Sequence, residues 1–333
     1  MNKRVLVTGA TGFLGQKLAT RLHEMGYDVT AQGRDERIGQ LLQERGIRFL
    51  RADLRDREAM VKACRDQDIV HHAAAFSSPW GTYRDMYETN VTGTIHVIEG
   101  CKLHGIQRLV HVSTPSIYFA FDDKLGIRED EPMPVRFANT YAQTKYQAEL
   151  EVDKAFLAGL PTITIRPRAL FGPGDNAILP RLIRANEKKF VPLIDGGKAI
   201  IDLTYVENVV DALILCMDSP AHTLGQAYNI TNGEPVTMIE VLSDVFQRLG
   251  VPLKTRELPY WKAYAAAWVL ETLSKTVLGY REPVLTRYSV GVLAKSQTLD
   301  ISKAKRDLGY EPRVSIAQGI ETFTEWWRTQ DGR

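Results

Sequence analysis

The chain has 333 residues, of which 44% are hydrophobic and 25% charged, and this composition suits one large globular domain or two closely joined ones. The 42 Lys and Arg nearly balance the 40 Asp and Glu, and no basic block or Cys/His finger spacing occurs, so we expect no nucleic-acid partner. The three Cys lack metal spacing and no apolar run reaches the roughly 20 residues that span a bilayer. We therefore expect a cytoplasmic protein without a metal site or transmembrane span.

Apolar runs alternate with helical periodicity through the first half of the chain. Strands are predicted at 5–7, 29–32, 48–52, 69–74, 108–113 and 161–166, and helices at 13–25, 41–45, 90–104 and 140–158. Such alternation predicts an α/β fold with a doubly wound parallel sheet. Beyond a turn-rich break at 171–175, helices are predicted at 178–186 and 206–218, a strand at 202–206, and mainly helix from 236 to 325.

We accordingly predict two parts of the chain. Residues 1–170 would form a dinucleotide-binding domain that also carries the catalytic side chains. Residues 171–333 would form a smaller, mainly helical C-terminal substrate lobe and lid, interleaved with the sheet around 200–230. In open α/β sheets, ligands bind beyond the carboxyl ends of the strands, which places this lobe over the expected site.

Three evenly spaced glycines follow the first predicted strand. Gly9, Gly12 and Gly15 lie between that strand and a helix, where a tight turn, close backbone approach and free helix N–H groups together bind a pyrophosphate. The alternative is a glycine-rich turn of an unrelated protein, but the strand–turn–helix context favours a nucleotide. The other side chains expected to line this turn are Thr11, Phe13 and Leu14.

The end of the second strand selects between the two nicotinamide cofactors. An acidic residue there binds the ribose hydroxyls of NAD, whereas an arginine accepts the 2′-phosphate of NADP. Gly33 takes the place of the acid and Arg34 follows it, so NADP(H) is favoured over NAD(H). Arg34 could instead be a solvated surface residue, and Asp35 could supply the acid in a shifted register.

Two further strand ends are expected to contact the cofactor. Asp53 and Leu54 end the third strand, where the carboxylate could accept the adenine amino group or could instead cap the next helix. Ala73 and Ala74 follow the fourth strand, and their small side chains would let the cofactor lie against the backbone.

Tyr141 and Lys145 begin a predicted helix with the i, i+4 spacing that places both side chains on one face. A nearby ammonium would lower the pKa of the phenol and make proton exchange with a substrate alcohol or ketone practical. An ordinary surface pair has the same spacing. A hydroxyl cluster, Ser113-Thr114-Pro115-Ser116, ends the preceding strand and gives the catalytic interpretation more weight.

These motifs together resemble the extended short-chain dehydrogenases. The motifs in chain order are Thr8-Gly9-x-x-Gly12-x-x-Gly15, Asp53-Leu54, Asn90-x-x-Gly93-Thr94, Ser113-Thr114, Tyr141-x-x-x-Lys145 and Arg166-Pro167. The resemblance implies an enzyme with a Rossmann sheet, a proton-donating Tyr141, and Lys145 bound to the nicotinamide ribose. It also implies a substrate-binding hydroxyl, placed on Thr114 by counting from Tyr118, with Ser113 and Ser116 as rivals.

The same resemblance assigns a supporting role to Asn90 behind the active-site helix and a cofactor contact to Pro167. The stretches Arg166–Asp175 and Asp202–Val206 are most similar to the 3β-hydroxysteroid dehydrogenase/isomerase-like branch, and 258–310 is similar to the bacterial 2-alkyl-3-oxoalkanoate reductases. This implies ketone–alcohol interconversion on a hydrophobic substrate such as a 3-oxo acid or a 3-hydroxysteroid. The alternatives are an NAD-dependent nucleotide-sugar epimerase or dehydratase and an inactive nucleotide-sensing protein.

The segment from Lys254 to Lys295 combines aromatic residues with seven Lys/Arg against three Glu. Such a cover suits a hydrophobic, anionic substrate or weak contact with a membrane surface. It equally suits a packed helix with a solvated face. The family's habit of pairing through helices near 90–104 and 140–158 implies a homodimer.

Overall fold

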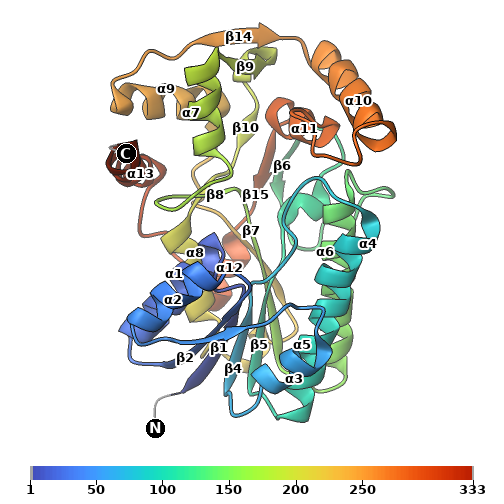
Figure 1. The fold of residues 1–333 in the computed structure, drawn as a ribbon, viewed down its shortest axis with the longest axis vertical. Helices are drawn as coiled ribbons and strands as arrows, with labels where there is room; N and C mark the ends of the chain where they lie inside the picture. Colours follow the sequence, from blue (N-terminus) through green and yellow to red (C-terminus); the bar gives the residue numbers. More distant parts are fainter. Residues whose placement is uncertain (1–2, 332–333) are drawn as a thin grey trace.

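The computed structural model describes residues 3–331 and is built around a seven-stranded parallel sheet (Figure 1). The strand order β12-β7-β5-β4-β1-β2-β3 runs outward in both directions from the adjacent β1 and β4, which is the doubly wound arrangement predicted from the sequence. The strands are β1 (Arg4–Thr8), β2 (Asp28–Gly33), β3 (Arg48–Arg51), β4 (Ile69–His72), β5 (Arg108–Val112), β7 (Thr162–Pro167) and β12 (Ala227–Ile230).

The sheet is buried on both faces because its strands alternate side chains between two helical layers. Val5 and Val7 of β1 pack into the core under α1 (Phe13–Glu24), while Leu6 packs into the opposite core. The first layer also contains α2 (Glu36–Glu44), α8 (Val206–Leu215) and α12 (Ser302–Leu308). The second contains α3 (Arg57–Ala63), α5 (Gly93–Leu103) and α6 (Thr140–Leu157), with α4 (Tyr83–Tyr87) at its upper end (Figure 1).

The C-terminal half forms a lobe above the carboxyl ends of the strands (Figure 1). It has its own apolar core, which includes Phe171, Phe246 and Phe323. Its helices are α7 (Leu179–Lys188), α9 (Met238–Leu249), α10 (Tyr260–Thr276), α11 (Arg287–Ala294) and α13 (Ile316–Asp331). Strand β6 (Lys124–Ile127), from the first half of the chain, joins this lobe by pairing with β15. The other short strands are β8 (Leu170–Phe171), β9 (Val191–Ile194), β10 (Ile200–Ile201), β11 (Thr204–Tyr205), β13 (Val236–Thr237), β14 (Thr255–Leu258) and β15 (Gln297–Leu299).

Three segments of the C-terminal half return to the main sheet. Strand β12 pairs with β7 from Ala227 to Ile230, and α8 and α12 pack into the core of the first layer, for example with Val209 and Ala304. The sequence pattern does not predict β12, because four residues without clear alternation become a strand only when β7 offers a free edge. None of the helices within residues 3–331 is both long and apolar enough to cross a bilayer.

Candidate active site

The turn between β1 and α1 has the geometry of an anion cradle. Gly9 has φ +70°, and a Cβ there would lie 2.7 Å from the Cα of Ala74. A Cβ on Gly15 would lie 2.2 Å from the carbonyl oxygen of Gly9, so both positions require glycine. Helix α1 begins after Gly12 with no side-chain cap, which leaves its first N–H groups for a ligand. The turn therefore fits a dinucleotide pyrophosphate.

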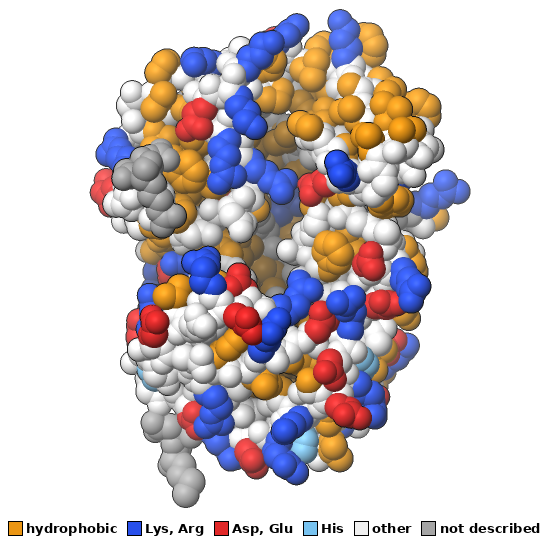
Figure 2. Space-filling view, in the orientation of Figure 1, with side chains coloured by type: hydrophobic (Ala, Val, Ile, Leu, Met, Phe, Trp, Pro, Cys, Tyr) orange, Lys and Arg blue, Asp and Glu red, His pale blue; other side chains and the backbone are white. Residues whose placement is uncertain are grey.

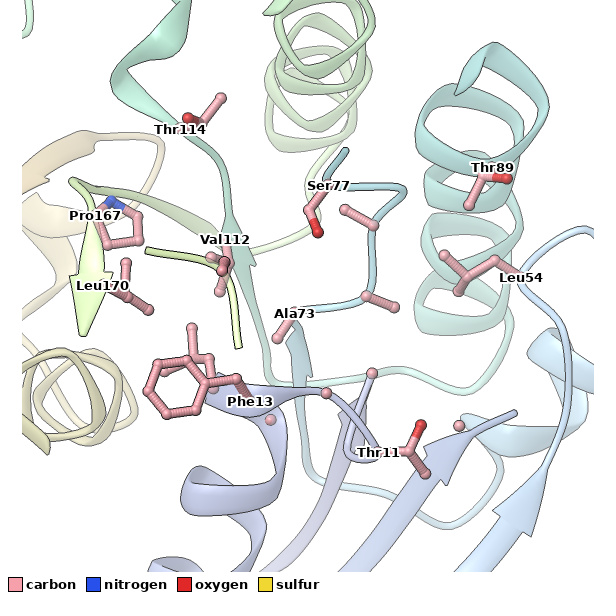
Figure 3. Close-up of a pocket in the computed structure, with 18 of the residues that line it drawn as sticks. Thr11, Phe13, Leu54, Ala73, Ser77, Thr89, Val112, Thr114, Pro167 and Leu170 are labelled. Atoms are coloured by element: carbon pink, nitrogen blue, oxygen red, sulfur yellow. The ribbon is translucent and has the colours of Figure 1, made fainter. Parts of the chain in front are cut away.

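A cleft of about 640 Å³ extends from this turn across the strand ends to α6. Figure 3 shows side chains from the β1–α1 turn, the end of β5 and the segment after β7 around one space. The residues predicted to bind the cofactor all line it: Gly9, Thr11, Gly12, Phe13, Leu14, Gly15, Arg34, Asp53, Leu54, Ala73, Ala74, Tyr141, Lys145 and Pro167. The volume lies in the range of small-molecule and cofactor sites.

At the end of β2, the side chain of Thr11 occupies the space that a side chain at position 33 would need. A Cβ on Gly33 would lie 2.4 Å from Thr11 Oγ1, so this structure accommodates no carboxylate there. Asp35 is not available either, because its side chain caps α2 by accepting a hydrogen bond from Ile38 N at 3.0 Å. Arg34 follows Gly33 with an exposed side chain, and it is the one arginine among the described residues that line the cleft.

Asp53 lies on the cleft wall between two arginines. Arg55 donates two side-chain hydrogen bonds of 3.0 Å to it, and Arg34 lies 3.5 Å away. The hydrogen bond from Arg55, helped by the charge of Arg34, lowers the pKa of Asp53 to about 2. The helix-cap alternative for Asp53 is wrong, since Asp56 caps α3 by accepting from Ala59 N at 3.0 Å.

Tyr141 lies in the first turn of α6, where Asn139 caps the helix by accepting from Ala142 N at 2.8 Å. Its side chain and that of Thr114, which follows β5, both line the cleft. Burial raises the pKa of Tyr141 to about 12, and the nearby Thr114 hydroxyl only partly opposes this effect. The phenol is therefore held protonated, as a proton donor must be before it reacts.

The expected lowering of the Tyr141 pKa by Lys145 is not found. Lys145 Nζ donates to the carbonyl oxygen of Val112 at 2.7 Å and lies 3.4 Å from Nε2 of His111, below the cleft floor. Burial also lowers the pKa of Lys145 to about 8. The i, i+4 spacing places both side chains on one face of α6, but the strand carbonyl determines where the ammonium points.

The Thr114 hydroxyl is the first of three hydrogen-bonded hydroxyl groups, a hydroxyl chain that the sequence did not predict. Thr114 Oγ1 donates to Ser116 Oγ at 3.0 Å, and Ser116 Oγ lies 2.7 Å from the hydroxyl of Tyr288. Ser113, the other rival, lines the cleft with a buried hydroxyl that has no partner among the described residues. Tyr288 comes from α11, more than 140 residues after Tyr141, and no motif marks it.

Asn90 lies behind the cleft and does not line it. It is buried in a π-helical turn (Glu88–Thr92), a feature that is common at functional sites. Its Oδ1 accepts from Phe76 N at 2.7 Å, and its Nδ2 donates to Thr144 Oγ1 at 3.1 Å. Asn90 thus joins the loop after β4 to the helix that carries Tyr141 and Lys145.

Comparisons with known proteins agree with this geometry. The NAD dependent epimerase/dehydratase family matches residues 5–231. The chain is 36% identical to the 2-alkyl-3-oxoalkanoate reductase of Stenotrophomonas maltophilia, over 95% of this chain and 97% of that protein. It is 32% identical to the mouse (Mus musculus) sterol-4-alpha-carboxylate 3-dehydrogenase, decarboxylating, over 96% and 89%. Among solved structures, MoeE5 in complex with UDP-glucose and NAD is similar with a TM-score of 0.79 and 27% identity, over 98% and 99%.

Proposed function

The chain belongs to the NAD-dependent epimerase/dehydratase family, and from this premise we propose that it is an NADP(H)-dependent oxidoreductase that interconverts a ketone and a secondary alcohol on a hydrophobic substrate. The observation that carries the proposal is that Tyr141 and Thr114 lie together on the wall of a cleft that also contains the glycine turn. A sensor of nucleotides would need the turn but not this pair of hydroxyls.

The division of roles follows from the positions of the side chains. The bound nicotinamide would supply or accept the hydride. In the direction of reduction, Thr114 would bind the carbonyl oxygen and Tyr141 would donate its proton to that oxygen. Lys145, held by the Val112 carbonyl, would bind the cofactor ribose, and Asn90 would support α6 from behind. Gly9, Gly12 and Gly15 would hold the pyrophosphate.

Replacing Tyr141 with Phe tests the catalytic assignment. We expect turnover to fall by about 10²–10⁴-fold, because the proton donor is removed. Cofactor affinity, measured by quenching of protein fluorescence, should stay nearly unchanged. Tyr146→Phe is the matched control, since Tyr146 lies on the same helix in a small apolar cluster with Phe137. Turnover retained in Tyr141→Phe would contradict the proposal.

The preference for NADP(H) rests on Gly33, Thr11 and Arg34. The space beside Gly33 admits no acidic side chain, and the Arg34 guanidinium suits a phosphate better than a diol. We expect Arg34→Gln to weaken NADPH binding roughly 10–100-fold, the range of a charge-assisted hydrogen bond, and to leave NADH binding unchanged. Arg37→Gln, an exposed arginine of α2, is the control.

A nucleotide-sugar epimerase is the second candidate, favoured by the similarity to MoeE5 with its UDP-glucose and NAD. Denaturing the purified protein and identifying any released nucleotide separates the two. Copurified NAD together with weak NADPH binding would favour the epimerase, and an empty protein that prefers NADPH would favour the reductase. Asp175, an acid that lines the cleft, accepts hydrogen bonds from Ala177 N and Leu179 N, which occupies both of its oxygens and speaks against dehydratase chemistry.

The substrate class is supported by the lining and by the relatives. Leu170 and Ile178 give the cleft an apolar wall. The names of the two relatives described above both contain a carboxylate and an oxidation or reduction at carbon 3. Arg168, which directly follows Pro167, does not line the cleft: it is buried, donates to Gln297 and interacts with the charge of the buried Asp202. The anionic part of the proposal is therefore supported by the carboxylates in the names of the two relatives. Higher kcat/KM for 3-oxo acids than for their methyl esters would support this, and equal values would contradict it.

The assembly proposed for this enzyme is a cytoplasmic homodimer. Leu103 of α5, and Leu150 and Leu157 of α6, expose large apolar side chains on neighbouring helices of one layer. The three cysteines are free and buried, which suits a reducing compartment. Sedimentation equilibrium should find a dimer that Leu157→Glu dissociates, and a monomeric wild-type protein would contradict the proposal.

A further inference from the structure

Helix α10 is placed with its large apolar side chains outward. Its fully buried residues are small or polar, namely Ala263, Ala267, Glu271 and Ser274, and the aromatic side chains packed beside them, Tyr260 and Tyr264, are only half-buried. The opposite side carries Trp261, which is 68% exposed, and Trp268, which is 54% exposed. Surface helices of globular proteins have the reverse arrangement, with the apolar stripe facing the core.

The exposed apolar side chains continue beyond the helix. We define the apical surface as Trp261, Trp268, Val269, Leu270, Leu273, Val277, Leu278, Tyr280 and Val284. The described residues include 21 exposed large hydrophobic side chains, and nine of these lie between positions 261 and 284. Figure 2 shows apolar side chains gathered over the end of the molecule where Figure 1 places α10. Concentrated exposure of this kind marks an interaction site.

The charges around the apical surface are mainly positive. Lys262, Lys275 and Arg281 are exposed between positions 261 and 284. Of the two acids in that range, Glu271 is buried and paired with Arg287 at 2.8 Å, and Glu282 is exposed and lies 3.6 Å from Arg181. The surface thus combines tryptophans and aliphatic side chains with three exposed cations, and its exposed carboxylate already has Arg181 as a partner.

We propose that the apical surface docks on an anionic lipid bilayer, with α10 lying in the interface. Tryptophans favour the boundary between headgroups and acyl chains, and flanking cations are attracted to anionic headgroups. A second copy of the chain suits the surface less well. A two-fold interface apposes identical patches, and this would bring two sets of three cations together with only Glu282 of each copy as a countercharge.

The position of the surface gives docking a consequence for the site. Helix α10 packs against α11, and α11 carries Tyr288, whose hydroxyl lies 2.7 Å from Ser116 in the hydroxyl chain of the cleft. The docked lobe would therefore be the one that carries the last member of this hydroxyl chain, and docking would place that lobe next to the bilayer. The docking itself does not depend on the proposed reaction.

Vesicle flotation of the full-length protein tests the proposal. We expect the protein to float with vesicles of phosphatidylcholine and phosphatidylglycerol and to bind pure phosphatidylcholine at least tenfold more weakly. Binding should fall as salt increases, because the lipid charge is screened. The variant Lys262→Gln/Lys275→Gln/Arg281→Gln should lose on the order of 100-fold in partitioning to anionic vesicles.

Trp261→Gln/Trp268→Gln should also abolish flotation, whereas Leu125→Gln, an equally exposed apolar residue outside the apical surface, should not. Thermal melting and cofactor binding show that each variant is folded. Absence of flotation by the wild-type protein would overturn the proposal. It would also be overturned if the tryptophan variant dissociated a dimer in sedimentation equilibrium, because the surface would then bind a second copy.

Discussion

A buried ion pair holds the catalytic helix against the sheet. Glu149 of α6, one turn after Lys145, accepts hydrogen bonds from Arg166 of β7 at 3.1 and 3.2 Å through Nε and at 2.5 Å through Nη2. Both side chains are less than one-tenth exposed. Arg166 also donates to the hydroxyl of Tyr118, which follows the hydroxyl cluster. The pair thus joins α6, β7 and the segment that carries Thr114.

Glu149→Gln leaves the Arg166 guanidinium buried without a countercharge. Breaking a buried pair in this way costs roughly 3–5 kcal/mol of unfolding free energy. With an unfolding entropy of about 2 cal/mol/K per residue, a chain of this length loses about 4–7 °C in Tm. Glu99→Gln is the control, because Glu99 forms an exposed pair with Arg57 that is worth about 1 kcal/mol or less.

Urea denaturation followed by circular dichroism measures both variants, and calorimetry gives Tm. The double variant Glu149→Met/Arg166→Met should cost less than the sum of the two single variants, because no unpaired charge remains. A loss below about 1 kcal/mol in Glu149→Gln, equal to that in Glu99→Gln, would refute the reasoning.

Three further predictions concern the cleft. Burial lowers the pKa of Lys145 to about 8, so the ammonium loses its proton as pH rises through that value. We therefore expect kcat/KM to fall above about pH 8. In Lys145→Arg, whose guanidinium keeps its charge, this fall should move to a pH above about 10. Gly15→Ala, whose Cβ would lie 2.2 Å from the Gly9 oxygen, should weaken cofactor binding at least tenfold in a fluorescence titration and lower stability by about 1–3 kcal/mol. Tyr288→Phe should lower kcat about tenfold with unchanged cofactor affinity, whereas the Tyr264→Phe control should not; equal kcat values would show that the hydroxyl chain is not used.

The sequence by itself determined those features of the protein that depend on interactions between residues close together in the chain. The positive φ of Gly9 and the contact of Gly15 with the Gly9 carbonyl are local features of the β1–α1 turn, and the spacing of Tyr141 and Lys145 is fixed by the helical repeat. The alternation of strands and helices likewise predicted the doubly wound sheet. Every residue assigned to the cofactor lines the cleft for this reason, since strand ends of a parallel sheet meet at one edge.

Tertiary structure decided what depends on partners distant in the chain. Strand β12 exists because β7 offers an edge, and Tyr288 reaches Ser116 because the C-terminal lobe folds back over the cleft. The pKa of Tyr141 is raised rather than lowered, because the phenol is buried and the Lys145 ammonium points at a strand carbonyl instead. The outward side of α10 was also not determined by its sequence, since apolar residues lie all around that helix and only packing selects which of them meet solvent.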